Sequence, residues 1–183
     1  NRTYAGIWHL AEKKYVQLAD PALPTVTVTD DSTRAAGSDD RAYRRMVDYD
    51  GNYTDLYVVD TRTGERKLAL KQLRAGFGGA ASWSPSGRHA AYFRDRHWHV
   101  LDATTLQARN LTETLPVKFY DEDDDTPDPP GAYGAATWTK DGRALLISDR
   151  YDVWYVPADG TAARNLTAGA GRQEKIVFRV QRI

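Results

Sequence analysis

Two stretches of this sequence repeat one another and decide its fold: SWSPSGRHAAYFRD, which begins at Ser82, and TWTKDGRALLISDR, which begins at Thr137. The pentapeptide ARNLT closes both repeats, ending at Thr112 and at Thr167. Tryptophan, glycine, arginine and asparagine residues therefore recur at a single offset of 55 residues. A period of this size, built from short apolar runs and turn residues, is typical of a repeat architecture and not of an enzyme fold with a single core.

Each repeat reads as four short antiparallel strands joined by tight hairpins. Gly, Asp, Ser and Pro residues stand at the turns, where the backbone needs them. In the later repeat the turns fall at 141–142 and 159–160. In the earlier repeat the strands are expected at 80–84, 89–93, 98–101 and 107–111.

A weaker repeat appears when the same offset is applied backwards along the chain. Val28 then takes the position of Trp83, and an insertion at 39–53 precedes an inner strand. That inner strand, at 56–59, is apolar on both faces, as expected for a strand between two neighbouring layers. The chain ends look incomplete: 7–18 resembles the last hairpin of a preceding repeat, and 175–183 reads as an opening strand.

Four-stranded antiparallel repeats of roughly 40–50 residues are the blades of a β-propeller, which has about 4–8 of them. Helical periodicity is nearly absent. We therefore expect an all-β fold, an arc of a larger propeller. The expected parts are the end of a preceding blade at 1–24, blades at 25–73, 78–115 and 135–168, an acidic inter-blade loop at 116–134, and the start of a further blade at 169–183.

Composition removes several classes of function. Lysine plus arginine equals aspartate plus glutamate at 25 each, so the chain lacks the basic excess typical of nucleic-acid binding. No apolar run approaches the ~20 residues that a membrane-spanning helix needs. The sequence contains no cysteine, which removes disulfides, thiolate zinc sites and cysteine catalysis together.

Several segments resemble one family. These are 95–112, the acidic run FYDEDDD that begins at Phe119, the repeat at 137–167, and AYRR at 42–45 followed by TDLYVVDTRTGE. They are similar to the propeller domain of secreted bacterial prolyl oligopeptidase-family serine peptidases, over about residues 25–183. The WSPSG motif is shared with Tol-B-type periplasmic propellers, whereas DRYDVW after an acidic loop is more discriminating.

The resemblance implies a larger peptidase of which this chain is a non-catalytic part. In that family an α/β-hydrolase domain follows the propeller and carries a Ser-Asp-His triad. The nucleophile elbow of such a domain needs G-x-S-x-G at a strand-to-helix turn. The nearest sequences here, at 37–38 and 84–87, lack that spacing, so no catalytic residue is assigned.

Two functions follow as expectations. In the first, the chain gates access to a C-terminal α/β-hydrolase domain and helps to bind peptide substrates, in the periplasm or outside the cell. In the second, it is a Tol-B-type propeller that scaffolds protein partners. A polysaccharide-lyase propeller with a metal is a third and weaker alternative, because propellers host many functions.

The loop at 121–128 holds six acidic residues. Calcium takes six to eight oxygen ligands, so Asp121, Asp123 and Asp125 are weak metal candidates. The spacing matches no EF-hand, and a solvated or salt-bridged loop is the favoured interpretation. The Asx-rich run at 48–52 is likewise interpreted as a plain turn. No cofactor is expected.

His97 and His99 flank Trp98 on one expected strand, so both imidazoles leave the same face. Two histidines without a third ligand favour a structural role over a metal site. The tryptophans recur in register, and we expect Trp83 and Trp138 to occupy equivalent positions between blades.

All four asparagines stand in N-x-T sequons, at Asn1, Asn52, Asn110 and Asn165. The last two belong to the repeated NLT that closes each blade. We expect a side chain of this motif to hold the turn through a local hydrogen bond to the backbone.

Overall fold

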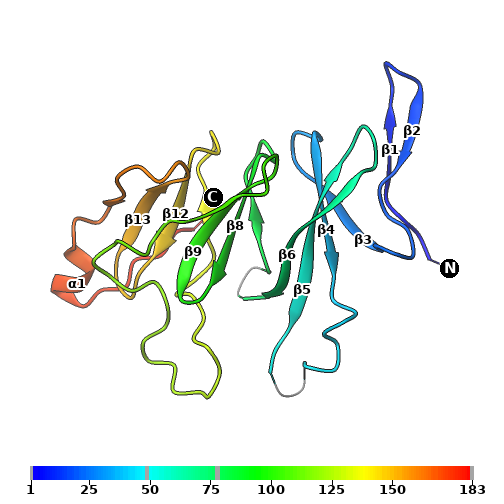
Figure 1. Cartoon of the computed structure of the whole chain (residues 1–183). Coiled ribbons are helices and arrows are strands. Elements are labelled where there is room, and N and C mark those ends of the chain that lie inside the picture. Colours follow the sequence, from blue (N-terminus) through cyan, green and yellow to red (C-terminus); the bar gives the residue numbers. More distant parts are fainter. Residues whose placement is uncertain (1, 48–49, 77–78, 182–183) are drawn as a thin grey trace. The chain divides into compact units, whose positions relative to one another are not determined.

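The computed structural model describes residues 2–47, 50–76 and 79–181 (Figure 1). The fold is all-β and is built of propeller-type blades, as predicted: three four-stranded antiparallel sheets and one two-stranded sheet lie within the described residues. The chain divides into two compact units, and each is described separately. The first unit comprises 1–74 and 85–88, and the second comprises 75–84 and 89–183.

The first unit contains a hairpin and one complete sheet. The hairpin pairs β1 (Gly6–His9) with β2 (Lys14–Gln17). The sheet has the strand order β3-β4-β5-β6, so each strand pairs with its neighbour in sequence. Val16, Leu18, Leu23, Ala35 and Val59 form its buried core. The strands of the sheet are β3 (Thr25–Val28), β4 (Arg34–Asp39), β5 (Tyr53–Asp60) and β6 (Arg66–Arg74).

The second unit contains two four-stranded sheets. The first has the order β7-β8-β9-β10 and the second β11-β12-β13-β14. The only helix among the described residues, α1 (Ala170–Glu174), follows the second sheet. The strands are β7 (Ser82–Trp83), β8 (His89–Arg94), β9 (His97–Asp102), β10 (Ala108–Asn110), β11 (Thr137–Trp138), β12 (Ala144–Ser148), β13 (Val153–Pro157) and β14 (Arg164–Asn165).

The strand register confirms the 55-residue repeat. Trp83 pairs with Ala90 across β7 and β8, and Trp138 pairs with Leu145 across β11 and β12. Both members of the second pair lie 55 residues after those of the first, so the two tryptophans are structurally equivalent. Their burial differs, because Trp138 is buried and Trp83 is only half-buried.

The repeated NLT motif closes each sheet by local hydrogen bonds, as predicted. The Asn110 side-chain oxygen accepts the backbone N–H of Thr112 at 3.0 Å, and the Thr112 hydroxyl oxygen accepts the N–H of Trp98 at 3.0 Å. Asn165 and Thr167 repeat the first of these bonds, at 2.9 Å. The asparagine thus shapes the turn, and the threonine fastens it to the third strand of its own sheet.

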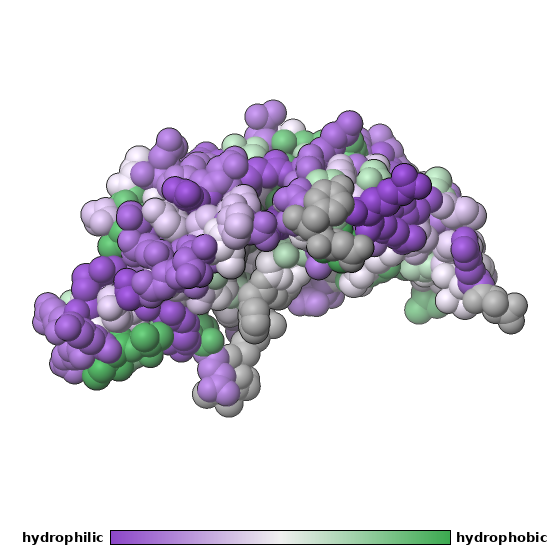
Figure 2. All heavy atoms as spheres, turned by 90° about the horizontal axis from the view of Figure 1, so that it is seen from below, coloured by the Kyte–Doolittle hydropathy of each residue, from purple (hydrophilic) through white to green (hydrophobic). Residues whose placement is uncertain are grey.

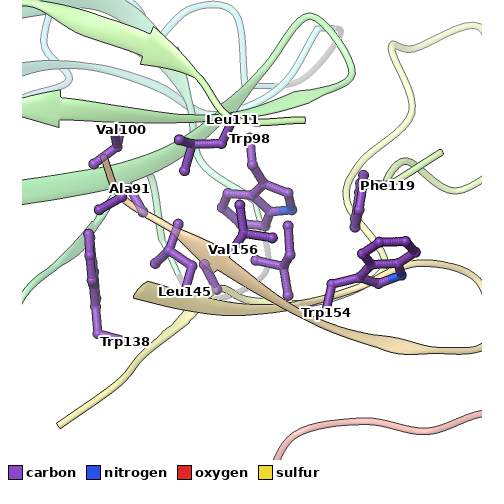
Figure 3. Packing of buried hydrophobic residues seen from close by; sticks show 12 residues of the cluster. Ala91, Trp98, Val100, Leu111, Phe119, Trp138, Leu145, Trp154 and Val156 are labelled. Atoms are coloured by element: carbon purple, nitrogen blue, oxygen red, sulfur yellow. The ribbon is translucent and has the colours of Figure 1, made fainter. Parts of the chain in front are cut away.

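One core joins the two sheets of the second unit. Alternate residues of each sheet point to the shared space, because successive strand residues face opposite sides. Figure 3 shows Trp138, Leu145 and Val156 of the later sheet among Ala91, Trp98 and Val100 of the earlier one. The Trp138 indole N–H also donates to the Ser82 carbonyl across the interface, at 2.9 Å.

The expected strand at 175–183 is wrong for the residues that the structure describes. The chain forms α1 after Gly169 and leaves it at Lys175, whose φ of 57° ends the helix. No strand is present from 175 to 181. The Phe178 N–H donates to the Tyr151 carbonyl at 2.7 Å, so the segment folds back on a turn of the preceding sheet. Its β-branched residues favour a strand, but a strand needs a partner to pair with.

Candidate functional site

The long connections of the second unit lie at one end of its sheets. In an antiparallel sheet, the link from the second to the third strand and the chain leaving the fourth strand emerge at the same end. The segments at this end are 94–97, 111–136, 149–152 and 166–181, which we call the loop end. The long excursion at 111–136 is visible in yellow-green in Figure 1. Because binding residues concentrate on loops held by a rigid scaffold, the loop end is the candidate site.

Asp149 organises the turn at 149–152 from a fully buried position. One carboxylate oxygen accepts the backbone N–H groups of Tyr151 and Asp152, each at 2.7 Å. The other accepts the Trp154 indole N–H at 3.0 Å and the Arg172 guanidinium at 3.2 Å. The buried charge is therefore both paired and hydrogen-bonded, which is the condition for burying it without a large penalty.

Asp152, also buried, ties the same turn to the C-terminal segment. One oxygen accepts the Thr167 hydroxyl at 2.6 Å and the Gly171 N–H at 3.0 Å. Burial opposes ionisation of Asp152, but the bonds from Thr167 and from the backbone N–H groups of Gly171 and Arg172 outweigh it and hold its pKa below the usual range. Its second oxygen is buried and has no hydrogen-bond partner among the described residues.

Gly171 lets the C-terminal segment approach this turn closely. A Cβ atom there would lie 2.8 Å from the carbonyl oxygens of Tyr151 and Ile176, and 2.9 Å from the Asp152 carboxylate. Two of these three neighbours are backbone atoms that cannot swing away. The segment after Thr167 is therefore fixed to the turn at 149–152.

The acidic loop has a fastened neck and an exposed tip. At the neck, the buried Phe119 packs edge-on against the Trp154 ring, with centroids 6.0 Å apart. The Asp121 N–H donates to the Gly131 carbonyl at 2.8 Å, and the Tyr133 hydroxyl accepts the Glu122 N–H at 2.9 Å. Residues 122–129 beyond the neck are exposed.

The structure places the three weak metal candidates on this loop without gathering them. Asp121 accepts the N–H of Asp123 at 3.0 Å, and the Asp123 carboxylate pairs with Arg150 at 2.8 Å. Asp125 lies on the exposed tip. Among the described residues, no group of three or more His, Cys, Asp or Glu side chains could hold a metal ion. Of the run at 48–52, residues 48 and 49 lie outside the described part, as does Asn1.

Cationic side chains lie over tyrosine rings around the loop. The Tyr120 ring has the Arg96 guanidinium 5.0 Å and the Lys118 ammonium 5.6 Å from its centroid. The Tyr151 ring has Arg150 and Arg172 at 5.5 Å each. These contacts hold cations beside the acidic tip. The loop end thus carries both signs of charge, and Lys118 and Arg150 pair with Glu122 and Asp123 of the acidic loop.

The two histidines of β9 have structural partners. The His99 ring stacks on Tyr92, with centroids 5.1 Å apart and planes 14° apart. A His97 ring nitrogen lies 3.2 Å from the Thr112 hydroxyl. Asp152 and Thr167 lie 55 residues after His97 and Thr112, so their contact is the equivalent one in the later sheet.

We expect His99 to titrate below the ordinary histidine range, because burial disfavours its charged form and lowers its pKa. Unfolding restores a pKa of about 6.5, so the unfolded chain binds the proton more readily and stability falls as the pH drops below about 6.5. Thermal melts at several pH values, compared with those of His99→Gln, check this. A pH dependence unchanged in the variant, or an NMR titration of His99 at or above the ordinary value, would contradict it.

The sequence marked DRYDVW at 149–154 as a discriminating segment but gave no role to Asp149, Asp152, Gly171 or Arg172. The available signal is a break in the repeat: DRYD at 149–152 stands where the preceding repeat has RDRH. The earlier repeat has Arg94 and His97 at the positions of Asp149 and Asp152. This change from cationic residues to carboxylates indicates a role that is specific to the later repeat. In the structure, His97 and Asp152 contact the equivalent threonines Thr112 and Thr167.

Comparison with known proteins identifies the fold. No protein-family model matches the chain, and no curated protein matches it in sequence. Its structure is similar to that of a protein described as a TolB from Agrobacterium tumefaciens, with a TM-score of 0.50 and 16% identity, over 84% of this chain and 50% of that one. The likeness shows the fold alone, and the chain spans half the length of that protein.

Two peptidases have lower structural similarity. An acylaminoacyl peptidase from Pyrococcus horikoshii has a TM-score of 0.44 and 14% identity, over 78% of this chain and 24% of that one. A puromycin hydrolase has a TM-score of 0.45 and 14% identity, over 82% of this chain and 23% of that one.

No helix among the described residues is long and apolar enough to cross a membrane.

Proposed function

We propose that this chain is the non-catalytic propeller portion of an extracytoplasmic prolyl oligopeptidase-type serine peptidase. Its task is to gate access to a C-terminal α/β-hydrolase domain and to help bind peptide substrates. The observation that carries the proposal is the loop end, where the DRYD turn at 149–152 contacts the acidic loop through the Arg150–Asp123 ion pair and holds the C-terminal segment through Asp152. The DRYDVW segment after the acidic loop is the more discriminating part of the resemblance to that family.

The loop end suits a gate for physical reasons. Its neck is fastened by buried contacts at Phe119, whereas its tip is exposed and charged. Such a loop can stand over the mouth of a catalytic chamber and exclude large folded proteins while short peptides pass. Closing a site in this way also removes water from the reacting bond. The peptide termini carry opposite charges, which the mixed carboxylates and guanidinium groups of the loop end can bind.

The proposal predicts no peptide hydrolysis by the 183-residue chain alone and hydrolysis by the longer polypeptide of the same gene. Chromogenic dipeptides and proline-containing oligopeptides are the substrates, and a serine-directed inhibitor is expected to abolish the turnover of the longer form. Inhibitor-sensitive turnover by the short chain would overturn the non-catalytic assignment. A longer form without G-x-S-x-G would favour the Tol-B-type scaffold instead.

Gating has a separate test in the longer form. Replacing 123–129 by a short Gly–Ser linker leaves the neck at Tyr120 and Ala132 in place. We expect this deletion to raise kcat/KM for long oligopeptides relative to dipeptides. The matched control is a linker in the tight turn at 103–106, which lies at the opposite end of the sheet. Equal changes for both substrate lengths would contradict a gate.

A further inference from the structure

Of the N-x-T sequons at Asn52, Asn110 and Asn165, only the first has an acidic residue two positions before its asparagine. It reads DGNYT from Asp50 to Thr54, whereas alanine stands at the corresponding position of the other two. The N-x-T pattern marks an asparagine as an acceptor for N-linked glycosylation. Bacterial oligosaccharyltransferases also select the acidic residue, because its carboxylate pairs with a cationic group of the enzyme. The sequence therefore sets Asn52 apart.

The sequon at Asn52 lies in an accessible link. Asn52 is exposed, directly precedes β5, and makes no side-chain hydrogen bond among the described residues. Figure 1 shows the link between β4 and β5 at the lower end of the first unit. Figure 2 views the molecule from that side and shows much hydrophilic surface there. A large enzyme can therefore reach the Asn52 amide from solvent.

The threonine of this sequon lies at a strand end that can open locally. β4 pairs with β5 only from Asp55 onward, so Tyr53 and Thr54 pair on one side, with β6. A register shift after Thr54 separates these two pairs from the rest of the ladder. The Thr54 hydroxyl donates to the adjacent Asp55 carbonyl at 3.2 Å, and the Asp50 carboxylate accepts the Tyr53 hydroxyl at 3.3 Å. Terminal pairs of this kind fray at little cost in free energy, so the whole acceptor segment can enter an enzyme cleft.

The sequons at Asn110 and Asn165 are closed by the fold. Each asparagine side-chain oxygen accepts an N–H of its own turn. Each sequon threonine accepts a backbone N–H from the third strand of its sheet, and Thr112 is only 1% exposed. An oligosaccharyltransferase must contact both the asparagine amide and the threonine hydroxyl of a sequon. It therefore cannot use these two segments unless the end of the sheet unfolds.

We propose that Asn52 is an N-glycosylation site of the folded chain and that the fold withholds Asn110 and Asn165. The donor is an oligosaccharide on a polyprenyl diphosphate, and the catalyst is an oligosaccharyltransferase of the type that requires the acidic residue. The Asn52 Nδ2 atom attacks the anomeric carbon of the first sugar, so that an N–C bond forms and the bond from this carbon to the diphosphate oxygen breaks. Nδ2 loses one proton, and the polyprenyl diphosphate leaves with the electron pair. In the cell the reaction rests on the extracytoplasmic location proposed above, but it does not depend on peptide hydrolysis.

The test incubates the folded 183-residue chain with a purified bacterial oligosaccharyltransferase and its undecaprenyl-diphosphate-linked oligosaccharide, and mass spectrometry locates the product. We expect one glycan, on Asn52. We expect none on Asn52→Gln or on Thr54→Val, which removes the sequon hydroxyl and keeps a β-branched side chain. Asp50→Asn is expected to react at least about tenfold more slowly, the scale for losing one charge-assisted hydrogen bond. Because the components are purified, this result is independent of where the chain resides in the cell.

Ala108→Asp is the matched control, because it gives the sequon at Asn110 the acidic residue that it lacks. Ala108 is exposed, so the variant is expected to fold, and a thermal melt checks this. A short peptide with the same change is expected to be glycosylated, whereas Asn110 of the folded variant is not. Modification of Asn110 in the folded variant would overturn the selection of Asn52 by the fold. An unmodified Asn52, in a reaction that glycosylates a peptide spanning 47–57, would overturn the proposal.

Discussion

Replacing Trp138 by alanine is expected to lower the free energy of unfolding by about 3–5 kcal/mol, the range for deletion of a buried aromatic side chain. Trp138 is buried at the interface between two sheets, its ring stacks near His89, and its indole N–H donates to the Ser82 carbonyl. The substitution therefore leaves a cavity and an unsatisfied carbonyl together. Chemical denaturation followed by circular dichroism measures the loss.

Trp83→Ala is the matched control for this experiment. Trp83 occupies the same place in the preceding sheet but is only half-buried, so its removal is expected to cost less. The two tryptophans occupy equivalent positions in their sheets but differ in burial. A difference between the two losses therefore measures the contribution of packing. Equal losses for both variants, or no loss for Trp138→Ala, would contradict the packing described for the second unit.

The second large effect is expected at Asp149. Asp149→Ala removes the acceptor for three N–H groups and the partner of Arg172, all around a fully buried carboxylate. A buried N–H group left without an acceptor costs about 1–3 kcal/mol, whereas the half-exposed Arg172 loses little when its partner is removed. Since the turn at 149–152 holds the C-terminal segment, we also expect faster proteolysis after Lys175.

Asp123→Ala is the control, because its carboxylate also pairs with an arginine of the same region but lies at the surface. An exposed pair contributes about 0–1 kcal/mol, so this variant is expected to melt close to the parent chain. Similar losses for both variants would mean that the Asp149 network contributes no more than a surface ion pair. If Asp149→Ala is cut no faster than the parent chain, then the turn at 149–152 does not hold the C-terminal segment in place.

The repeat made most of the fold predictable. Short-range features, such as Gly142 in a hairpin turn and the NLT closure, act within one sheet, so their sequence signals are local. The strand expected at 175–183 failed because strand formation depends on a partner, and Phe178 finds a turn carbonyl instead. Residues with high β-propensity favour an extended backbone, but they do not determine whether a partner strand is present.

The candidate site was less predictable for a related reason. The acidic loop could be seen as a charge run, but its contacts with Trp154 and Arg150 involve residues distant from it in sequence. The DRYDVW segment was marked by its resemblance to a family, but nothing in the sequence shows that Asp149 and Asp152 are buried. Charge patterns in a sequence show where carboxylates are, whereas their burial and partners arise only from tertiary packing.

The NLT closure has an evolutionary consequence. The hydrogen bonds of Asn110 and Thr112 are made within their own sheet and with the residue that follows the motif, as the N–H groups of Thr112, Trp98 and Glu113 show. A DNA segment cut after this motif therefore encodes a sheet whose last turn needs nothing from its neighbour. Gene duplication at that boundary can add a blade while keeping the hydrogen bond that fastens the threonine to the third strand of its own sheet. The identical ARNLT at 108–112 and 163–167 stands at the point where such a copy would be joined.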